Sequence, residues 1–383
     1  MSCARTYQIH MYKKISDDII LNLKNIPGWR SRRKIVVFEC DDFGGIRMPS
    51  ASVFYRLKER GLNISTSRFN IYDTLESGED LEQLYEVLLS VKDQNNSPAV
   101  FTPVTIMANP DFDRIRSAGF NEYYYETFDE TLKRYYPGEN VFETWKQGIR
   151  AGIFIPELHG RDHITVQFWL RKLREGDKDL LFAFDNNFVS LRVEGVPSPA
   201  DEFRAEFYFS EDSQKHFLEH SIHDAAEVFE RVLGYRAHAF IPGNGIFHPS
   251  MDKIVASTGI RFLNVTSSMP FPAKNGVLRH RYFITGQKGP DGLTYYTRNC
   301  AFEPTDPSYK GTDYTLKQIE AAFRWRKPAL ISTHRVNFSG GISPDNRAKG
   351  LTELKKLLFR IAGKWPDVEF LSLGAALESM REN

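Results

Sequence analysis

The sequence predicts an α/β fold, namely a distorted (β/α) barrel of seven or eight mainly parallel strands with loop insertions. Short apolar runs typical of strands alternate with longer amphipathic runs typical of helices, which indicates βαβ units and a mainly parallel sheet. Seven or eight such units in one chain of 383 residues favour a closed or nearly closed barrel over an open sheet.

The expected elements follow one another along the chain after an N-terminal arm at 1–33. The arm holds one expected helix, at 15–24, which Pro27 and Gly28 end. Residues 34–383 are expected to form one barrel domain. The expected strands lie at 34–39, 99–107, 153–158, 237–241, 260–265, 293–298, 328–333 and 367–371. The expected helices lie at 50–60, 78–93, 139–150, 163–174, 213–233, 249–257, 312–326 and 345–363.

Two irregular stretches interrupt this alternation, at 185–212 and at 267–290. The second holds Pro272, Gly276 and Gly289, which favour turns. Both stretches are interpreted as excursions from one domain, and the first is expected near the mouth of the barrel.

Composition excludes several classes of protein. Lys+Arg 50 against Asp+Glu 49 gives a net charge of +1, which argues against a nucleic-acid-binding protein. A hydrophobic content of 41%, with 29 Phe and 17 Tyr, predicts a globular core and suits a groove that stacks sugar rings. The three cysteines, Cys3, Cys40 and Cys300, lack metal-binding spacing and cannot all pair, so a reducing compartment is the simpler interpretation.

The expected location is the cytoplasm. Residues 1–14 lack the apolar run of a signal peptide, and no run in the sequence is long enough to span a membrane. No feature of the sequence specifies an oligomeric state.

Chemically reactive side chains follow three of the expected strands, at the point where each strand ends. They are Asp41 and Asp42, His159 and His163, and His334. In a parallel α/β protein the carboxyl ends of the strands carry the chemistry, so we expect these five side chains to converge at one mouth. One carboxylate and two imidazoles make a three-ligand site for a catalytic divalent metal. The second carboxylate and third histidine then remain as a general base and a general acid.

Each motif also has a structural interpretation. A His-x-x-x-His pair is often a surface pair, and two acidic residues after a strand often form a turn or a helix cap. The combination of all three motifs, each at a strand end, favours the chemical interpretation.

The order of the motifs resembles the polysaccharide deacetylase family, also called the NodB-homology superfamily. The resemblance covers about residues 34–373 and rests on four motifs: Asp41-Asp42, Leu-His-Gly-Arg-Asp-His at 158–163, Phe240-Ile-Pro-Gly-Asn-Gly245 and Ile331-Ser-Thr-His334. It implies a distorted (β/α) barrel that removes acetyl groups from N-acetylated sugars. It also implies one divalent metal ion, with zinc as the expected cation, and a sugar or glycan as the partner.

The resemblance implies a role for each matching residue. The implied metal ligands are Asp42, His159 and His163. Asp41 would be the catalytic base, His334 the general acid, and the backbone N–H of Asn244 would help to bind the oxyanion. Each metal-binding histidine needs an acceptor for its second ring N–H, and we expect Asp162, Glu157 or a backbone carbonyl to provide it.

Several positions depart from the family pattern. The arginine that orients the base is replaced by Ile241, the tyrosine of the third motif by Asn244, and the small hydroxyl residue of the histidine motif by Gly160. The Asp-Trp pair of the fourth motif is not recognisable near 263–266. The chain therefore resembles a divergent subfamily, whose substrate need not be a simple N-acetylglucosamine polymer.

Four polar residues near these motifs are candidates for substrate binding. Arg298 ends a strand-like run and either replaces the missing arginine beside Asp41, contacts substrate, or forms a structural salt bridge. Arg47 either contacts substrate or caps a helix. Arg335 and Asn337 either line a sugar pocket or shape the loop after His334.

Three functions remain open at this stage. The first is a metal-dependent sugar N-deacetylase. The second is a noncatalytic carbohydrate-binding relative with a residual metal site, which Ile241 favours and the retained Asp41 and His334 oppose. The third is a metal hydrolase of another acyl bond, such as a sugar O-acetyl ester.

Overall fold

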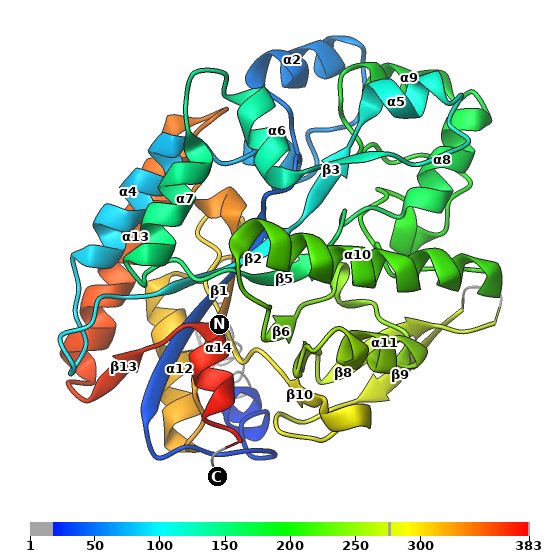
Figure 1. Cartoon of the computed structure of the whole chain (residues 1–383). Helices are drawn as coiled ribbons and strands as arrows, with labels where there is room; N and C mark the ends of the chain where they lie inside the picture. Colours follow the sequence, from blue (N-terminus) through cyan, green and yellow to red (C-terminus); the bar gives the residue numbers. More distant parts are fainter. Residues whose placement is uncertain (1–17, 275–276, 382–383) are drawn as a thin grey trace, which may run out of the picture.

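The centre of the molecule is a curled parallel sheet. The computed structural model describes residues 18–274 and 277–381 (Figure 1). Eight strands follow one another in the order β10-β7-β6-β5-β2-β1-β12-β11, and β13 pairs with β1 outside this path. The strands are β1 Lys34–Phe43, β2 Phe101–Ile106, β5 Glu157–Gly160, β6 Ala239–Phe240, β7 Phe262–Asn264, β10 Thr294–Tyr296, β11 Cys300–Ala301, β12 Ala329–His334 and β13 Val368–Phe370.

One broken strand bridges the two ends of this sheet. β10 pairs with β7, and β11 pairs with β12, yet only residues 297–299 separate β10 from β11 in the chain. The segment 294–301 therefore supplies the strands at both ends of the sheet, β10 and β11. This arrangement confirms the predicted distorted (β/α) barrel of mainly parallel strands.

Amphipathic helices cover the outside of the sheet (Figure 1). They are α4 Gly78–Leu89, α7 Val141–Arg150, α10 Lys215–Leu233, α11 Asp252–Ser257, α12 Thr312–Arg324 and α13 Pro344–Lys364. Their ends follow capping rules: α4 begins with a reciprocal capping box between Ser77 and Asp80, and α10 ends at Gly234 in the left-handed conformation. A short helix, α14 Leu373–Glu378, completes the chain.

The loops that follow β1, β2 and β5 build a second layer beyond the carboxyl ends of the strands (Figure 1). We call residues 46–72, 108–124 and 164–208 the cap. It contains α2 Ala51–Glu59, α3 Arg68–Tyr72, β3 Ala108–Pro110, α5 Phe112–Ser117, α8 Val166–Arg174 and α9 Lys178–Asp185, while β4 Tyr125–Thr127 and α6 Phe128–Tyr135 connect it to the barrel. The cap has its own hydrophobic core, in which the buried Trp169 packs on Phe112 and Phe184.

The two irregular stretches differ from one another in the structure. Between the end of α9 at Asp185 and a 3₁₀ turn that begins at Asp212, the first stretch carries one 3₁₀ turn, Ser198–Ala200. It contributes buried side chains such as Phe188 and Phe203 to the cap core. The stretch at 267–290, in contrast, forms an antiparallel hairpin of β8 Ser268–Pro272 and β9 Leu278–Tyr282.

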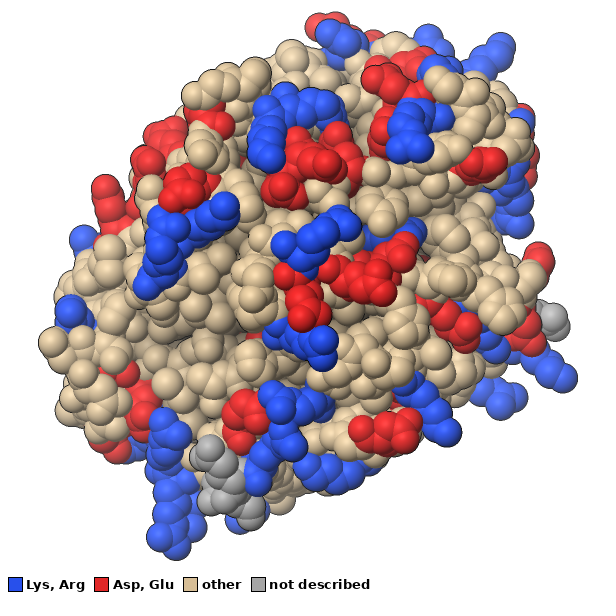
Figure 2. All heavy atoms as spheres, viewed as in Figure 1, with Lys and Arg blue, Asp and Glu red and all other residues tan. Residues whose placement is uncertain are grey.

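The described part of the N-terminal arm, residues 18–33, lies against the barrel. The expected helix at 15–24 begins outside the described residues, and 18–23 are helical. The boundary between an arm at 1–33 and a barrel domain at 34–383 stays a prediction. Within the described part of the chain, no helix combines the length and the apolar character needed to cross a membrane. On the face in Figure 2, Lys and Arg side chains alternate with Asp and Glu side chains, as the net charge of +1 suggests.

Candidate active site

A bulge in β1 brings two neighbouring carboxylates to the same mouth. In a regular strand, consecutive side chains point to opposite faces. The pairing of β1 with β2 shifts between Cys40 and Phe43, and Asp42 adopts a φ of 78°. This left-handed conformation is uncommon for a residue other than glycine and turns Asp42 toward the histidines. Asp41 stays in register with His334 on β12.

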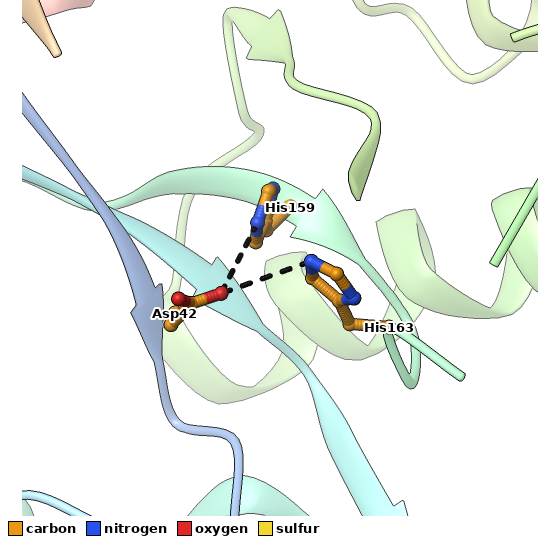
Figure 3. Close-up of side chains that lie close together, drawn as sticks. All are labelled: Asp42, His159 and His163. Carbon is orange, nitrogen blue, oxygen red and sulfur yellow. Dashed lines mark ion pairs between the residues drawn. The ribbon is translucent and has the colours of Figure 1, made fainter. Parts of the chain in front are cut away.

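Asp42, His159 and His163 form a cluster in which three ligand atoms lie within 4.8 Å of one another (Figure 3). The Oδ1 atom of Asp42 lies 3.6 Å from Nε2 of His159 and 3.7 Å from Nε2 of His163. These separations are too long for hydrogen bonds. Two ligands with bonds of about 2.1 Å to one tetrahedral ion lie roughly 3.4 Å apart, so the cluster has the dimensions of a metal site.

A backbone carbonyl fixes the orientation of His159. Its Nδ1 lies 2.7 Å from the carbonyl oxygen of Ile241, so Nδ1–H donates and Nε2 keeps its lone pair for a metal. The carboxylates suggested for this task are engaged elsewhere. Asp162 accepts from Arg161 and Tyr123, and Glu157 accepts from the backbone of residues 238 and 239.

The loop that carries His163 depends on a buried carboxylate that sequence reasoning missed. The backbone N–H of His163 donates to Oε2 of Glu206 at 3.1 Å, and the Ser221 hydroxyl donates to Oε1. Gly160 makes room for this contact, because a Cβ there would lie 2.5 Å from Glu206 Oε2. Gly243 similarly leaves space for the His163 ring, at 2.8 Å from such a Cβ.

The ionisation of this loop follows from its burial. Burial, together with the neighbouring His159, lowers the pKa of His163 to about 3, so its ring is neutral as a metal ligand must be. Burial and the charge of Asp162 raise the pKa of Glu206 to about 7.

Arg298 holds Asp41 in a bidentate ion pair. Its two terminal nitrogens donate to the two carboxylate oxygens, each at 2.6 Å, and its Nε donates to the buried Glu39 at 2.9 Å. Burial alone would raise the pKa of Asp41, but the Arg298 guanidinium lowers it below its usual value. Arg298 thus pairs with Asp41 from the segment between β10 and β11, which is one of the roles that the sequence left open for it, as a replacement for the arginine missing at Ile241.

His334 is paired with a carboxylate that sequence reasoning did not single out. Its Nδ1 lies 2.6 Å from Oε1 of Glu303, and its Nε2 lies 3.8 Å from Asp41 Oδ2. Arg68 and Asn337 donate to the other oxygen of Glu303. Burial alone would lower the pKa of His334, but Glu303 and the two aspartates raise it to about 9. Glu303 lies in the segment after β11, so only the three-dimensional fold reveals its proximity to β12.

The remaining candidates divide between the cavity and the interior. A cavity of about 560 Å³ is lined by Asp41, Asp42, His159, His163, His334, Asn244, Arg298 and Arg47, among others. Asn244 has a φ of 55°, and Arg47 donates to Asn70 at the cap side. Of the two roles left open for Arg335 and Asn337, the contacts favour the shaping of the loop after His334. Both are buried outside the cavity lining, where Arg335 binds Asp73 and Glu76 while Asn337 binds Glu303.

Comparison with known proteins identifies similar folds at low identity. No protein-family model matches this chain. No curated protein matches it either. Among solved structures, the chain is similar to 4-alpha-glucanotransferase from Thermococcus litoralis, with 11% identity and a TM-score of 0.47, over 90% of this chain and 40% of that one. The chain thus spans only two fifths of the glucanotransferase.

Two deacetylases show similar figures. A "probable polysaccharide deacetylase" from Pseudomonas aeruginosa has 10% identity and a TM-score of 0.44, over 92% of both chains. A variant of the peptidoglycan deacetylase PdaC from Bacillus subtilis has 8% identity and a TM-score of 0.37, over 91% of this chain and 92% of that one. The Pseudomonas protein bears the name of the family that the sequence motifs resemble.

Proposed function

We propose that this chain is a metal-dependent hydrolase that removes acetyl groups from N-acetylated sugars. One observation carries the proposal: a three-ligand cluster and an acid–base pair line the same cavity. The cluster consists of Asp42, His159 and His163, and the acid–base pair consists of Asp41 and His334. A noncatalytic sugar-binding protein would have no chemical need for the pair.

The ligand set fits a divalent cation, and we propose zinc. Two neutral imidazoles and one carboxylate are a common set for catalytic zinc with an open position. The lowered pKa of His163, about 3, keeps its ring neutral, and the contact of His159 Nδ1 with Ile241 directs Nε2 of His159 toward the cluster. When bound, the cation would act as a Lewis acid on the amide carbonyl and lower the pKa of a water molecule.

The charges on the acid–base pair suit amide hydrolysis. Asp41 is ionised because Arg298 stabilises its charge, so it can accept the proton of an attacking water. His334 is protonated at neutral pH because Glu303 stabilises its charge, so it can donate a proton to the departing amine. The backbone N–H of Asn244, at the cavity wall, would donate to the oxyanion.

Metal analysis and acetate release test this proposal together. The wild-type protein should bind one divalent ion per chain and release acetate from an N-acetylated sugar. The His159→Ala, His163→Ala double variant should lose both properties. Asp41→Asn should keep the metal and lose about 10²–10⁴-fold in rate, the usual contribution of a proton-transfer group.

The leaving group distinguishes the two proton-transfer roles. His334→Ala should impair amide hydrolysis more than hydrolysis of an activated acetyl ester, whose alcohol leaves without prior protonation. Asp41→Asn should impair both substrates similarly. Stoichiometric metal in the double-histidine variant, or wild-type deacetylation by Asp41→Asn, would contradict the proposal.

A further inference from the structure

The N-terminal arm contributes a cation to the active-site cavity. Lys24 lines the same cavity as Asp42 and His334. Its Nζ donates to the carbonyl oxygen of Asn299 at 2.5 Å, in the segment that bridges the two ends of the barrel sheet. The arm therefore forms one wall of the site.

Hydrogen bonds fix the arm to the barrel in the residues that follow Lys24. The Lys327 ammonium donates to the carbonyl oxygens of Pro27, Gly28 and Trp29 at 2.7, 2.6 and 2.5 Å. The side chain of Asn299 donates to the side chain of Asn25 at 2.9 Å. These bonds determine where Lys24 lies relative to the cavity.

A hydrogen bond at Asn22 and a close backbone approach at Gly28 also hold the arm against the barrel. Asn22 accepts from the indole of Trp325 at 3.0 Å. Gly28 has a φ of 88°, and a Cβ there would lie 2.4 Å from the carbonyl oxygen of Thr285, so only glycine lets the arm approach this closely.

Lys24 differs from the other cations of the cavity because no carboxylate balances its charge. Arg298 is balanced by Asp41 and Glu39, and Arg47 lies 3.4 Å from Glu202. Among the described residues, no aspartate or glutamate forms an ion pair with Lys24, whose exposed side chain donates to a neutral backbone carbonyl. A solvent-accessible ammonium at the cavity wall, with no carboxylate paired to it, can donate a charge-assisted hydrogen bond to an anionic ligand.

We propose that the substrate carries an anionic oxygen group, a carboxylate or a phosphate, and that Lys24 binds it. This inference rests on the proposed function only in that the acetylated part of the same sugar would face the metal ligands. The anionic group would lie at the side of the cavity formed by the arm, beside Asn299. The protein would then select a charged sugar over a neutral one.

Binding to metal-depleted full-length protein tests this without relying on turnover. Calorimetry would compare N-acetylglucosamine, N-acetylglucosamine 1-phosphate and N-acetylglucosaminuronic acid. At least one charged sugar should bind about tenfold more tightly than the neutral one, or better, since a hydrogen bond to a charged group contributes about 1.5–3 kcal/mol. Preference for the phosphate or for the uronic acid identifies which anion the site takes.

Variants of Lys24 test whether the preference for charged sugars depends on the positive charge of its side chain. Lys24→Met should abolish the preference and leave binding of the neutral sugar unchanged, whereas Lys24→Arg should retain it. Lys58→Met is the matched control, because Lys58 is an exposed lysine on α2 outside the cavity. Equal binding of all three sugars by the wild type, no binding, or a preference that survives Lys24→Met would overturn the inference.

The same proteins separate this inference from the proposed function. Acetate release from the metal-loaded wild type on a neutral sugar, without any preference for the charged sugars, refutes only the role of Lys24. A charge preference that depends on Lys24, without acetate release from any sugar, refutes only the deacetylase proposal.

Discussion

At the scale of single residues, Glu303 governs both the position and the charge of His334. Its carboxylate accepts from Nδ1, which leaves Nε2 facing Asp41. Its negative charge also stabilises the imidazolium, so the pKa of His334 rises from near 6.5 to about 9. A general acid must hold its proton until the amine departs, and this pairing keeps it protonated at neutral pH.

The raised pKa predicts the alkaline limb of the rate profile. The protonated form of His334 is complete well below pH 9 and is lost as the pH rises through about 9, so kcat should fall there. Glu303→Gln removes the stabilising charge and should move this limb to lower pH. A bound cation would shift the alkaline limb to lower pH in both the wild type and Glu303→Gln, and the limb of the variant would still lie at the lower pH. The measurement is kcat against pH for both proteins.

A distant glutamate provides the control for this shift. Glu320→Gln removes a carboxylate from the exposed side of α12, where it pairs with Lys364, and should leave the limb in place. If Glu303→Gln shows the wild-type limb, then Glu303 does not set the pKa of the acid.

The sequence predicted a set of reactive residues but not Glu303 and Glu206, which contact His334 and His163. Asp41, His159 and His334 each stand at the end of an apolar run, which is a local pattern. Glu303 and Glu206 stand in segments without such a pattern. They reach the site through contacts between segments that are separated by 31 and 43 positions. Such contacts depend on the whole fold, which a local pattern does not encode.

At the scale of elements, the end of β5 is shaped by glycine. Gly160 has a φ of 116°, which L side chains rarely adopt, and it lies against Glu206. The family-like sequence pattern places a small hydroxyl residue here. In this chain the Glu206 carboxylate takes up the space and receives the backbone N–H of His163. The position of His163, a proposed metal ligand, thus depends on the absence of a side chain at Gly160.

Substitution of this glycine should weaken metal binding. Gly160→Ala introduces backbone strain and also places a Cβ 2.5 Å from Glu206, so the loop and His163 must move. We expect a loss of about 10–100-fold in metal affinity, as for other groups that orient ligands. Competition with a chelator measures the affinity, and denaturant unfolding measures the accompanying loss of stability.

Gly152→Ala separates strain from crowding. Gly152 also has a positive φ, 71°, but a Cβ there meets no atom within 4 Å. It should lose about 1–2 kcal/mol of stability from strain alone and keep the wild-type affinity for metal. Equal affinity in the two variants would show that the contact with Glu206 does not position His163.

Element prediction succeeded where hydrophobic periodicity was strong. The helix expected at 345–363 is observed at Pro344–Lys364, because its apolar face packs on the barrel over many turns. The sequence predicted Asp41 and Asp42 at one mouth but not the bulge that directs them there. Its exact geometry depends on the pairing of β1 with β2, which is a contact between strands.

At the scale of the whole molecule, the described residues form three hydrophobic clusters, two of which contain a fully buried tryptophan. The largest belongs to the barrel and its covering helices, where Trp145 packs on Phe43 and Phe154. The second belongs to the cap, where Trp169 packs on Phe184. Sequence reasoning predicted helices at 50–60 and 163–174, which are observed as α2 and α8 of the cap, and a loop insertion at 185–212, but it did not predict that these segments share a core. The cap core exists only when the three segments assemble.

Matched tryptophan variants should reveal how independent the two cores are. Each indole is fully buried, so Trp169→Ala and Trp145→Ala should each cost about 3–5 kcal/mol. Because few strand ladders tie the cap to the sheet, Trp169→Ala should accelerate hydrogen exchange mainly at 164–208 and spare β1 and β2. Trp145→Ala should affect the barrel strands. Uniform acceleration by Trp169→Ala would show that the two cores open as one unit.

The broken strand at 294–301 has a consequence for how the molecule fails under stress. Its two halves pair with different strands, and Arg298, which lies between the halves, forms ion pairs with Glu39 and Asp41 of β1. If heating separates the two ends of the sheet, we expect the Arg298 guanidinium to lose its contact with Asp41 before the strands unfold. Inactivation should therefore precede the loss of secondary structure, and a tightly bound substrate, by drawing these groups together, should also act as a clasp on the barrel.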